Sequence, residues 1–206
     1  MSRLSEVRFL TSVASAAQFP VDAGAEVAFA GRSNAGKSSA INAITHRRGL
    51  ARTSKSPGRT RLLNYFELSP MKRLVDLPGY GYAGVTVSER AAWLPLLETL
   101  RERSSLTGLF LIVDSRRGLT EGDEALIEWS HGARRLHVLL SKADKLNRGE
   151  AAAALRTASA QLGSRGTVQL FSALRGIGVH EAQDRLTAWL TMAPQQGSGQ
   201  YKTPAG

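Results

Sequence analysis

One short glycine-rich stretch constrains this chain more than any other: Gly31-Arg-Ser-Asn-Ala-Gly-Lys-Ser38. It fits G-x-x-x-x-G-K-[ST], in which glycines let the backbone curl until successive N–H groups point at anionic oxygens. Residues 25–30 read as a buried strand before it, and residues 37–46 as a helix whose N-terminal dipole attracts the same charge. These flanks favour a phosphate-binding loop over a glycine-rich turn with an incidental lysine.

The residue types in the loop predict how a nucleoside triphosphate would be held. Lys37 can reach the β- and γ-phosphates, and the Ser38 hydroxyl can bind Mg²⁺. The loop by itself distinguishes neither ATP from GTP nor a hydrolase from a kinase. The phosphate contacts that we expect here are Gly31, Arg32, Ser33, Asn34, Ala35, Gly36, Lys37, Ser38 and Ser39.

Composition narrows the class of protein. The 206 residues suit one domain, and the absence of cysteine excludes disulfides, thiolate metal sites and a cysteine nucleophile. No apolar run approaches the roughly 18 residues that span a bilayer, and the N-terminus lacks a signal-peptide pattern. We therefore expect a cytoplasmic protein without a membrane partner. The four histidines form no metal-ligand pattern with acidic residues, so we expect them to be structural or on the surface.

The charge of the chain points to a polyanionic partner. The net charge is +10 and the isoelectric point is near 10.6. No acidic residue lies between Glu26 and Glu67, and the basic residues there are Arg32, Lys37, Arg47, Arg48, Arg52, Lys55, Arg59 and Arg61. Residues 47–61 form a basic, Ser- and Gly-rich loop that could contact a phosphate backbone in a salt-dependent way. The alternative is a solvated loop whose charge only keeps the chain soluble.

The order of apolar segments predicts an α/β fold with a mixed, mostly parallel six-stranded sheet flanked by helices on both faces. The strands expected are 25–30, 62–68, 71–77, 106–114, 135–140 and 168–171. The pair joined at Ser69-Pro70 should be antiparallel. Caps predict helix starts at Ser88, at Thr120 with Asp123 and at Asn147 with Glu150, while Pro95 predicts a kink or a start inside the first of these helices.

The domain plan that follows has three parts. Residues 1–22 are expected to be an N-terminal extension with a short edge strand at 7–10, residues 23–192 a nucleotide-binding domain, and residues 193–206 a disordered tail. Ligands bind such sheets at the carboxyl ends of the strands. Gly31, Asp76, Ser141 and Ser172 each follow or end a strand, which predicts a single nucleotide site.

Two further segments are candidates for reading the γ-phosphate and Mg²⁺. In Asp76-Leu-Pro-Gly79 the acid can hold a Mg²⁺ water and the Gly79 N–H can approach the γ-phosphate, although Asp-x-Pro-Gly is also an ordinary capped turn. Thr60 can complete the Mg²⁺ shell and order its loop, with Thr53, Ser54 and Ser56 as competitors. The phosphate contacts expected from these segments are Gly58, Arg59, Thr60, Asp76, Leu77, Pro78 and Gly79.

A third segment, Ser141-Lys-Ala-Asp144, has the residues to recognise guanine. The Asp144 carboxylate can accept hydrogen bonds from N1–H and the 2-amino group, and adenine offers no such pair of donors. The Lys142 stem can lie along the base, and the backbone N–H groups of 172–173 can reach O6. The guanine contacts expected are Ser141, Lys142, Ala143, Asp144, Phe171, Ser172 and Ala173.

These segments, in this order, resemble the five guanine-nucleotide motifs of translation-factor-like GTPases. The chain is most similar to the EngB (YihA/YsxC) family of bacterial ribosome-assembly GTPases, within the TrmE-Era-EngA-EngB-septin-like superfamily. The similarity lies in the Asn34 phosphate loop, Ser56-Pro-Gly-Arg-Thr-Arg61, Asp76-Leu-Pro-Gly-Tyr-Gly-Tyr-Ala83 and Ser141-Lys-Ala-Asp-Lys-Leu146, and covers roughly residues 7–192. The resemblance implies a Ras-like P-loop fold and GTP hydrolysis with Mg²⁺. It also implies a role in assembling the large ribosomal subunit and a requirement for normal division and septation.

The chain departs from the family pattern at a few positions. Ser141 stands where Thr or Asn is usual, and its hydroxyl can still brace the phosphate loop. Arg59 and Arg61 stand where Lys and Gln are frequent, with no consequence that we can identify.

Catalysis is expected to be slow. Tyr80 occupies the position at which many GTPases place a water-orienting Gln. The missing group would come from a partner, from a reordered loop or from K⁺, because Asn34 resembles a K⁺-binding Asn of related GTPases; alternatively Asn34 only shapes the loop. We assign no general base. Lys37, Thr60 and Gly79 are expected to support the transition state.

Three functions remain open from the sequence. The first is a nucleotide-gated GTPase acting as a monomer on the large ribosomal subunit or its precursors, through rRNA and ribosomal proteins. The second is a P-loop ATPase or small-molecule kinase, against which Asp144 and the lack of an acceptor-binding insertion argue. The third is a P-loop nucleotide-binding RNA-interaction module without nucleotide-gated switching.

Overall fold

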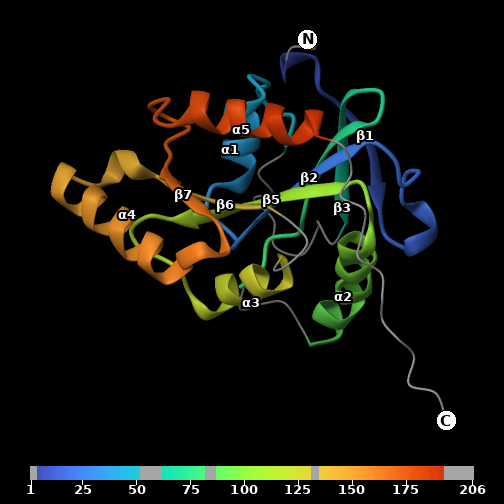
Figure 1. The fold of residues 1–206 in the computed structure, drawn as a ribbon. Helices are drawn as coiled ribbons and strands as arrows, with labels where there is room; N and C mark the ends of the chain where they lie inside the picture. The colour runs from blue at the N-terminus through green and yellow to red at the C-terminus, as the bar shows by residue number, and fades with distance from the viewer. Residues whose placement is uncertain (1–3, 52–61, 82–86, 131–134, 193–206) are drawn as a thin grey trace.

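The protein is built on one seven-stranded sheet with strand order β1-β3-β4-β2-β5-β6-β7 (Figure 1). A computed structural model describes residues 4–51, 62–81, 87–130 and 135–192, with only the backbone described over 87–93. The strands are β1 (Arg8–Val13), β2 (Ala25–Gly31), β3 (Leu63–Ser69), β4 (Lys72–Asp76), β5 (Leu106–Asp114), β6 (Arg135–Ser141) and β7 (Thr167–Leu170).

The predicted mixed sheet is confirmed, and the expected strand number is corrected from six to seven. β3 runs antiparallel to both of its neighbours, β1 and β4, whereas the pairs β4–β2, β2–β5, β5–β6 and β6–β7 are parallel. The seventh strand is β1, at the edge of the sheet, where the short edge strand expected at 7–10 is present and extends to Val13. Its side chains are exposed or half-buried except for Val13, so it lacks the apolar pattern by which a core strand is recognised.

Helices cover both faces of the sheet (Figure 1). They are α1 (Lys37–Ile44), α2 (Val87–Glu102), α3 (Glu121–Ser130), α4 (Arg148–Leu162) and α5 (Val179–Thr191). Helices α1 and α5 pack together on one face, against β2 and β5. Helices α2, α3 and α4 contribute buried residues to the core on the opposite face.

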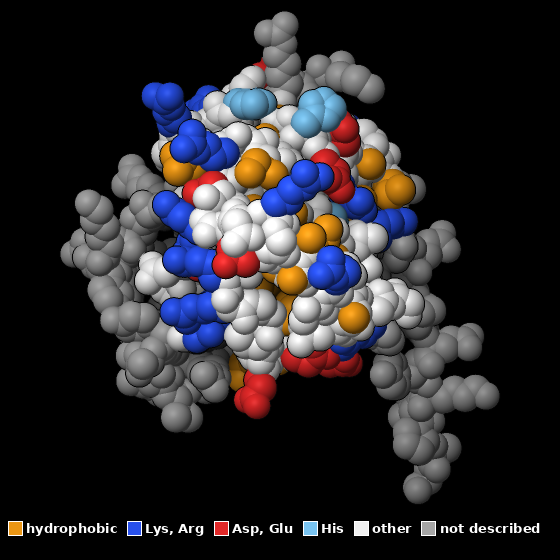
Figure 2. All heavy atoms as spheres, turned by 90° about the vertical axis from the view of Figure 1, so that its left-hand side faces the viewer, with side chains coloured by type: hydrophobic (Ala, Val, Ile, Leu, Met, Phe, Trp, Pro, Cys, Tyr) orange, Lys and Arg blue, Asp and Glu red, His pale blue; other side chains and the backbone are white. Residues whose placement is uncertain are grey.

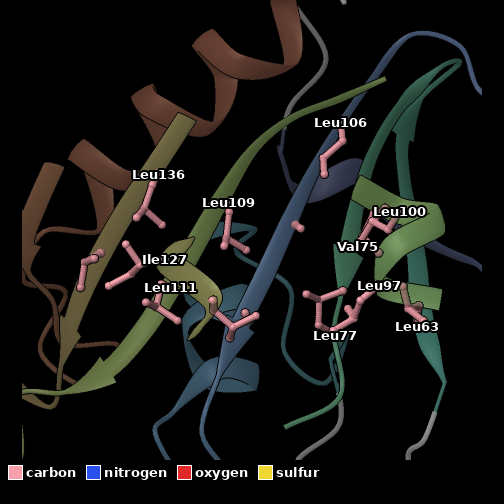
Figure 3. Close-up of a cluster of buried hydrophobic side chains, with 14 of the residues drawn as sticks. Leu63, Val75, Leu77, Leu97, Leu100, Leu106, Leu109, Leu111, Ile127 and Leu136 are labelled. Carbon is pink, nitrogen blue, oxygen red and sulfur yellow. The ribbon is translucent and has the colours of Figure 1, made fainter. Parts of the chain in front are cut away.

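The buried strand β5 divides its side chains between two cores, as the period of two in a strand requires. Leu109 and Leu111 point to the face covered by α2 and α3, where they lie near Ile127 and belong to the same buried cluster as Leu100 (Figure 3). Phe110 points to the other face and packs on the Trp189 ring of α5, with centroids 5.0 Å apart. Burial on both faces explains the near-continuous apolar run of this strand.

The predicted helix signals hold in the main. The Asn147 side chain accepts from the Glu150 N–H in a full capping box, and α4 ends before Gly163. The Thr120 N–H donates to Asp123 at 2.8 Å at the start of α3. Helix α2 begins at Val87, so Ser88 is not the cap that was expected, and the helix continues through Pro95 rather than beginning there.

Of two further expected helix ends, one lies earlier in the structure and the other falls on a residue that the structure does not describe. Helix α1 ends at Ile44 rather than at residue 46, because His46 turns to a left-handed backbone with φ 51°. The closing residue expected for α3, Gly132, lies outside the described residues.

The end of the sheet opposite the nucleotide motifs holds a buried ion cluster. Glu26 is fully buried at the start of β2 and accepts from Arg103 Nε and Nη2 and from Arg73 Nη1, each at 2.8–3.0 Å. Arg103 also donates to the carbonyls of Pro20 and Val21. The segment before β2 is thereby tied to the domain. No helix in the described residues is long and apolar enough to cross a membrane.

Candidate functional site

The phosphate loop leaves β2 at the centre of the sheet, where the strand order changes direction. Gly31 has no room for a side chain, because a Cβ there would lie 2.7 Å from the Ile112 carbonyl of β5. Gly36 precedes α1 with φ 101°, and Asn34 also takes a left-handed backbone with φ 65°. These reversals give the loop the curled path that a cradle of N–H groups requires.

Lys37 and Asp76 form an ion pair at the mouth of this loop. Their side chains are 11% and 8% exposed, so the pair is nearly buried. Burial raises the pKa of Asp76 above its ordinary value, and the Lys37 charge opposes that rise. The hydroxyl of Ser38 and the carboxylate of Asp76 are hard oxygen donors, which fits the ligand preference of Mg²⁺.

The segment after Asp76 returns to the phosphate loop as expected. The Leu77 N–H donates to the Phe29 carbonyl, and the Leu77 side chain is buried in the core. Pro78 is buried, whereas Gly79 is exposed beside the loop, where an added Cβ would lie 3.4 Å from Ser33 N. The Ser33 N–H donates to the Tyr80 carbonyl at 2.9 Å. Gly79 is therefore adjacent to the loop, as a γ-phosphate contact requires.

Tyr80 is anchored away from the phosphate loop by its hydroxyl. The phenol donates to Asp123 Oδ1, and Asp123 is nearly fully buried at the start of α3. Burial, reinforced by the Asp123 charge, raises the pKa of Tyr80. The Tyr80 hydroxyl is thus engaged with α3.

Residues 141–144, expected to recognise guanine and called the guanine loop below, are bound to the phosphate loop by two side chains. The Ser141 hydroxyl lies 2.5 Å from the Ala35 carbonyl, so the brace expected from the sequence is present. The Lys142 ammonium donates to the Asn34 carbonyl at 2.7 Å and to Asp114 at 2.8 Å. These contacts make the two loops parts of one site.

Asp144 and Ser172 meet at the far side of the guanine loop. The Ser172 hydroxyl donates to Asp144 Oδ1 at 2.5 Å and holds the pKa of that carboxyl below its ordinary value. The carboxylate is thus ionised and pre-oriented, as an acceptor for guanine must be.

Two expected guanine contacts need correction. The Phe171 side chain is 1% exposed and belongs to the core, so it cannot stack on a base. The Ser172 N–H donates to the Ile177 carbonyl at 2.9 Å and is not available for guanine O6. Both residues instead position the loop, since the Phe171 carbonyl accepts from the Ala143 N–H. Of the residues expected to reach O6, Ala173 is the one that this correction leaves.

The structure does not test every expected residue. Gly58, Arg59 and Thr60 lie outside the described residues. Arg32 lies beside Gly81, where a Cβ would be 2.7 Å from its Nε. Within the described ranges no group of three or more His, Cys, Asp or Glu side chains could hold a metal ion. Buried His137 bonds to Thr167 and Gln169 and has the structural role expected of the histidines.

Two cavities flank the phosphate loop on the side of α3. One of about 330 Å³ is lined by Asn34, Asp114, Arg116 and Lys142 among others, but not by Lys37, Ser38 or Asp144. The other, of about 550 Å³, is a mainly apolar groove between Tyr80, Leu97 and Trp129. The first cavity therefore includes the start of the phosphate loop and Lys142, whereas the second touches the phosphate loop only at Arg32. The rest of the site follows from the arrangement of the motifs themselves.

Two acidic residues of this region were not assigned to the site from the sequence. Asp114 contacts Lys142, and Asp123 contacts Tyr80. Asp114 carried a usable signal, because it ends a continuous apolar strand as Asp76 does. The sequence marks Asp123 only as a helix cap, and nothing in it links this residue to Tyr80, 43 positions earlier.

Positive charge forms no single patch on the face of the molecule shown in Figure 2. Figure 2 shows one face of the molecule, on which Lys and Arg side chains are spread with acidic side chains between them. Most of the basic 47–61 segment lies outside the described residues.

The mostly parallel sheet, the phosphate loop and the guanine loop joined to it define the protein as a P-loop GTPase. The family pattern described as "50S ribosome-binding GTPase" matches residues 26–142. A probable GTP-binding protein EngB of Methylococcus capsulatus is 49% identical over 204 residues, 96% of each chain. That of Aromatoleum aromaticum is 50% identical over 203 residues, 96% of this chain and 94% of the relative. The chain belongs to the EngB family of GTP-binding proteins.

Solved structures agree with this fold. The crystal structure of a probable GTP-binding protein EngB matches with a TM-score of 0.62 at 20% identity, over 81% of this chain and 98% of that one. A structure of Era matches with a TM-score of 0.60 at 18% identity, over 80% of this chain and 56% of that one. At these identities the likeness concerns the fold alone.

Proposed function

We propose that this protein is a slow GTPase that acts in the cytoplasm as a nucleotide-gated assembly factor for the large ribosomal subunit. In this proposal it is needed for normal cell division and septation. The observation that carries the nucleotide part is the pair of contacts Ser141–Ala35 and Lys142–Asn34, at 2.5 and 2.7 Å. They hold the guanine-reading carboxylate and the phosphate loop in one fixed arrangement, which favours a guanine nucleotide over a bare polyphosphate.

In the proposed binding mode, Lys37 leaves Asp76 for the β- and γ-phosphates. Mg²⁺, held by the Ser38 and Thr60 hydroxyls and through water by Asp76, would neutralise phosphate charge. The Gly79 N–H would then contact the γ-phosphate, and Lys37, Thr60 and Gly79 would stabilise the charge that develops there. Asp144 accepts from the guanine edge, and Ala173 donates to O6.

Slow turnover follows from the side chain at position 80. The Tyr80 hydroxyl is bound to Asp123, and a phenol offers no carboxamide to orient water. We propose that a partner or K⁺ at Asn34 supplies the missing stabilisation. If K⁺ does so, replacing it by Na⁺ at equal ionic strength should lower the single-turnover rate of wild-type protein but not of Asn34→Ser.

The ribosomal part of the proposal rests on the net positive charge of the chain and on the family to which it belongs. The net charge of +10 favours an rRNA partner, and the family description names the 50S ribosome. Nucleotide gating would arise because the basic 47–61 segment contains Thr60, whose contact to Mg²⁺ exists only with the triphosphate.

Co-sedimentation with purified large ribosomal subunits and their precursors tests this proposal. The protein is loaded with a non-hydrolysable GTP analogue, with GDP or with nothing, at low and at physiological salt. Pelleting of the GTP form alone at physiological salt supports the gated factor. Equal pelleting of all three forms at physiological salt would instead support the alternative, an RNA-interaction module without nucleotide-gated switching. Equal pelleting that disappears with salt would show that the positive charge acts nonspecifically.

A further inference from the structure

Asp114 stands at the carboxyl end of β5, between the phosphate loop and the guanine loop. It is 7% exposed and lies opposite Ser141 in the parallel pairing of β5 and β6. Its Oδ2 accepts from Lys142 Nζ at 2.8 Å and from Arg116 Nη2 at 2.7 Å, and its Oδ1 accepts from Arg116 Nε at 2.9 Å. The carboxylate therefore has a cation on each side.

Lys142 is constrained at both of its ends. Its backbone has φ 59°, a left-handed conformation that is uncommon for a residue with a side chain. Its ammonium is fixed between the Asn34 carbonyl and Asp114. A stem anchored in this way must run from the guanine loop to the phosphate loop, along the space between Asp144 and the phosphate cradle.

We propose that Asp114 is a positioning residue for guanine recognition, which holds the Lys142 ammonium on the Asn34 carbonyl so that the Lys142 stem presents a fixed face to the base. This inference rests on the proposed guanine site. Asp114 does not touch the nucleotide and acts only through Lys142.

The contacts of Asp114 keep its carboxylate ionised as a counter-ion for the Lys142 ammonium. The Arg116 hydrogen bonds are the main cause that holds the pKa of Asp114 well below its ordinary value, so the charge persists at physiological pH. Arg116 also fixes the carboxylate plane, because its backbone N–H and its guanidinium both donate to Oδ1. A lysine with only a backbone carbonyl as partner would spend more of its time in solvent, since a long side chain gains rotamer entropy when released.

The test compares ligands that do and do not carry a base. Affinities for GDP and for inorganic pyrophosphate are measured by calorimetry for wild type and Asp114→Asn. We expect GDP affinity to fall by about 10- to 100-fold, the loss typical of a charge-assisted contact, and pyrophosphate affinity to stay within about twofold. A general disruption of the site would lower both affinities together, and that result overturns the proposal, as does an unchanged GDP affinity.

Asp22→Asn is the matched control. Asp22 accepts from the Ser104 and Ser105 N–H groups at 3.0 and 2.9 Å, near the opposite end of the sheet. This substitution should leave both affinities unchanged. Arg116→Ala, which keeps the Asp114–Lys142 contact, should change GDP affinity less than threefold. If Arg116→Ala lowered GDP affinity as much as Asp114→Asn, the effect of Asp114 would not depend on its contact with Lys142, and the proposal would be wrong.

A double-mutant cycle isolates the path through Lys142. In a Lys142→Met background, Asp114→Asn should lower GDP affinity by less than about twofold further, because the group that it positions is gone. Full additivity would contradict the inference. A separate measurement tests the guanine site itself: if wild-type protein bound ADP as tightly as GDP, the proposed guanine site would be wrong.

Discussion

At the scale of single residues, the site depends on side chains whose partners fix both charge and direction. Asp144 accepts from Ser172 and Lys142 donates to Asn34, so the groups that would read a base are oriented by contacts within the protein. Pre-orientation of this kind reduces the ordering cost of binding.

Asp144→Asn should reverse the base preference. An amide presents a donor where guanine also presents a donor, whereas xanthine presents an acceptor there. We expect GTP affinity to fall by about tenfold or more and xanthosine triphosphate to bind. The Asn oxygen can still accept from Ser172, so the loop should keep its shape. Unchanged GTP affinity in a calorimetric titration would mean that the base is read elsewhere; exposed Asp184→Asn is the control.

His137 should make stability depend on pH. Burial lowers its pKa from 6.5 to about 4, although the Gln169 hydrogen bond acts in the opposite direction. The native state holds it neutral, because Thr167 and Gln169 satisfy both ring nitrogens. Below pH 6.5 the unfolded state gains the proton first. The contribution of neutral His137 to the free energy of unfolding is therefore complete above pH 6.5. It is lost as the pH falls toward 4, which lowers the free energy of unfolding by about 3 kcal/mol.

Urea unfolding at a series of pH values measures this contribution. The difference in unfolding free energy between wild type and His137→Gln should shrink from pH 7 to pH 4. Parallel curves for wild type and His137→Gln would refute the assignment.

At the scale of elements, close approach between strand and helix decides which small residues are required. Gly108 of β5 lies under the Trp189 ring of α5, and a Cβ added there would be 2.4 Å from Cε3. The ring is held in turn by Phe110. The helix can therefore approach this strand closely only over a glycine.

Gly108→Ala should destabilise the protein by about 1–3 kcal/mol through overpacking. The midpoint of urea unfolding measures this. Gly149→Ala in α4 is the matched control, since its Cβ would meet only Asn147 Oδ1 at 3.4 Å. This control substitution should leave the free energy of unfolding unchanged or raise it by up to about 1 kcal/mol, because Ala has a higher helix propensity than Gly. Equal effects at both positions would contradict the packing argument.

At the scale of the whole molecule, the two ends of the sheet serve different purposes. The carboxyl end carries the nucleotide motifs, and the opposite end carries the Glu26–Arg73–Arg103 cluster that ties down the segment before β2. Seven residues of β2 separate the two, roughly 20 Å of extended chain.

Glu26→Gln should lower stability without affecting the site. It leaves Arg73 and Arg103, each 5–6% exposed, without their buried counter-charge, at a cost of about 3–5 kcal/mol. GDP affinity should stay within about twofold at a temperature where the variant is folded. Glu67→Gln, which removes a pair with largely exposed Arg8, should cost about 1 kcal/mol or less. A parallel loss of GDP affinity in Glu26→Gln would show that the ends are coupled.

The sequence by itself determined the elements and the motif positions, because both depend on local chemistry. The phosphate loop needs glycines and Lys37 within eight residues, the period of two marks β5, and Asn147 with Glu150 starts α4. Strand ends then placed Gly31, Asp76 and Ser141 at one edge of the sheet. Only the tertiary structure could decide contacts between distant segments, because they depend on register and packing.

The contacts between distant segments are also where the sequence interpretation needed correction. The structure extended the expected edge strand to Val13 and paired it with β3, placed Phe171 in the core and occupied the Ser172 N–H. It also joined Asp114 to Lys142 and Tyr80 to Asp123. A polar side chain has many potential partners along a chain, and only the folded geometry selects one.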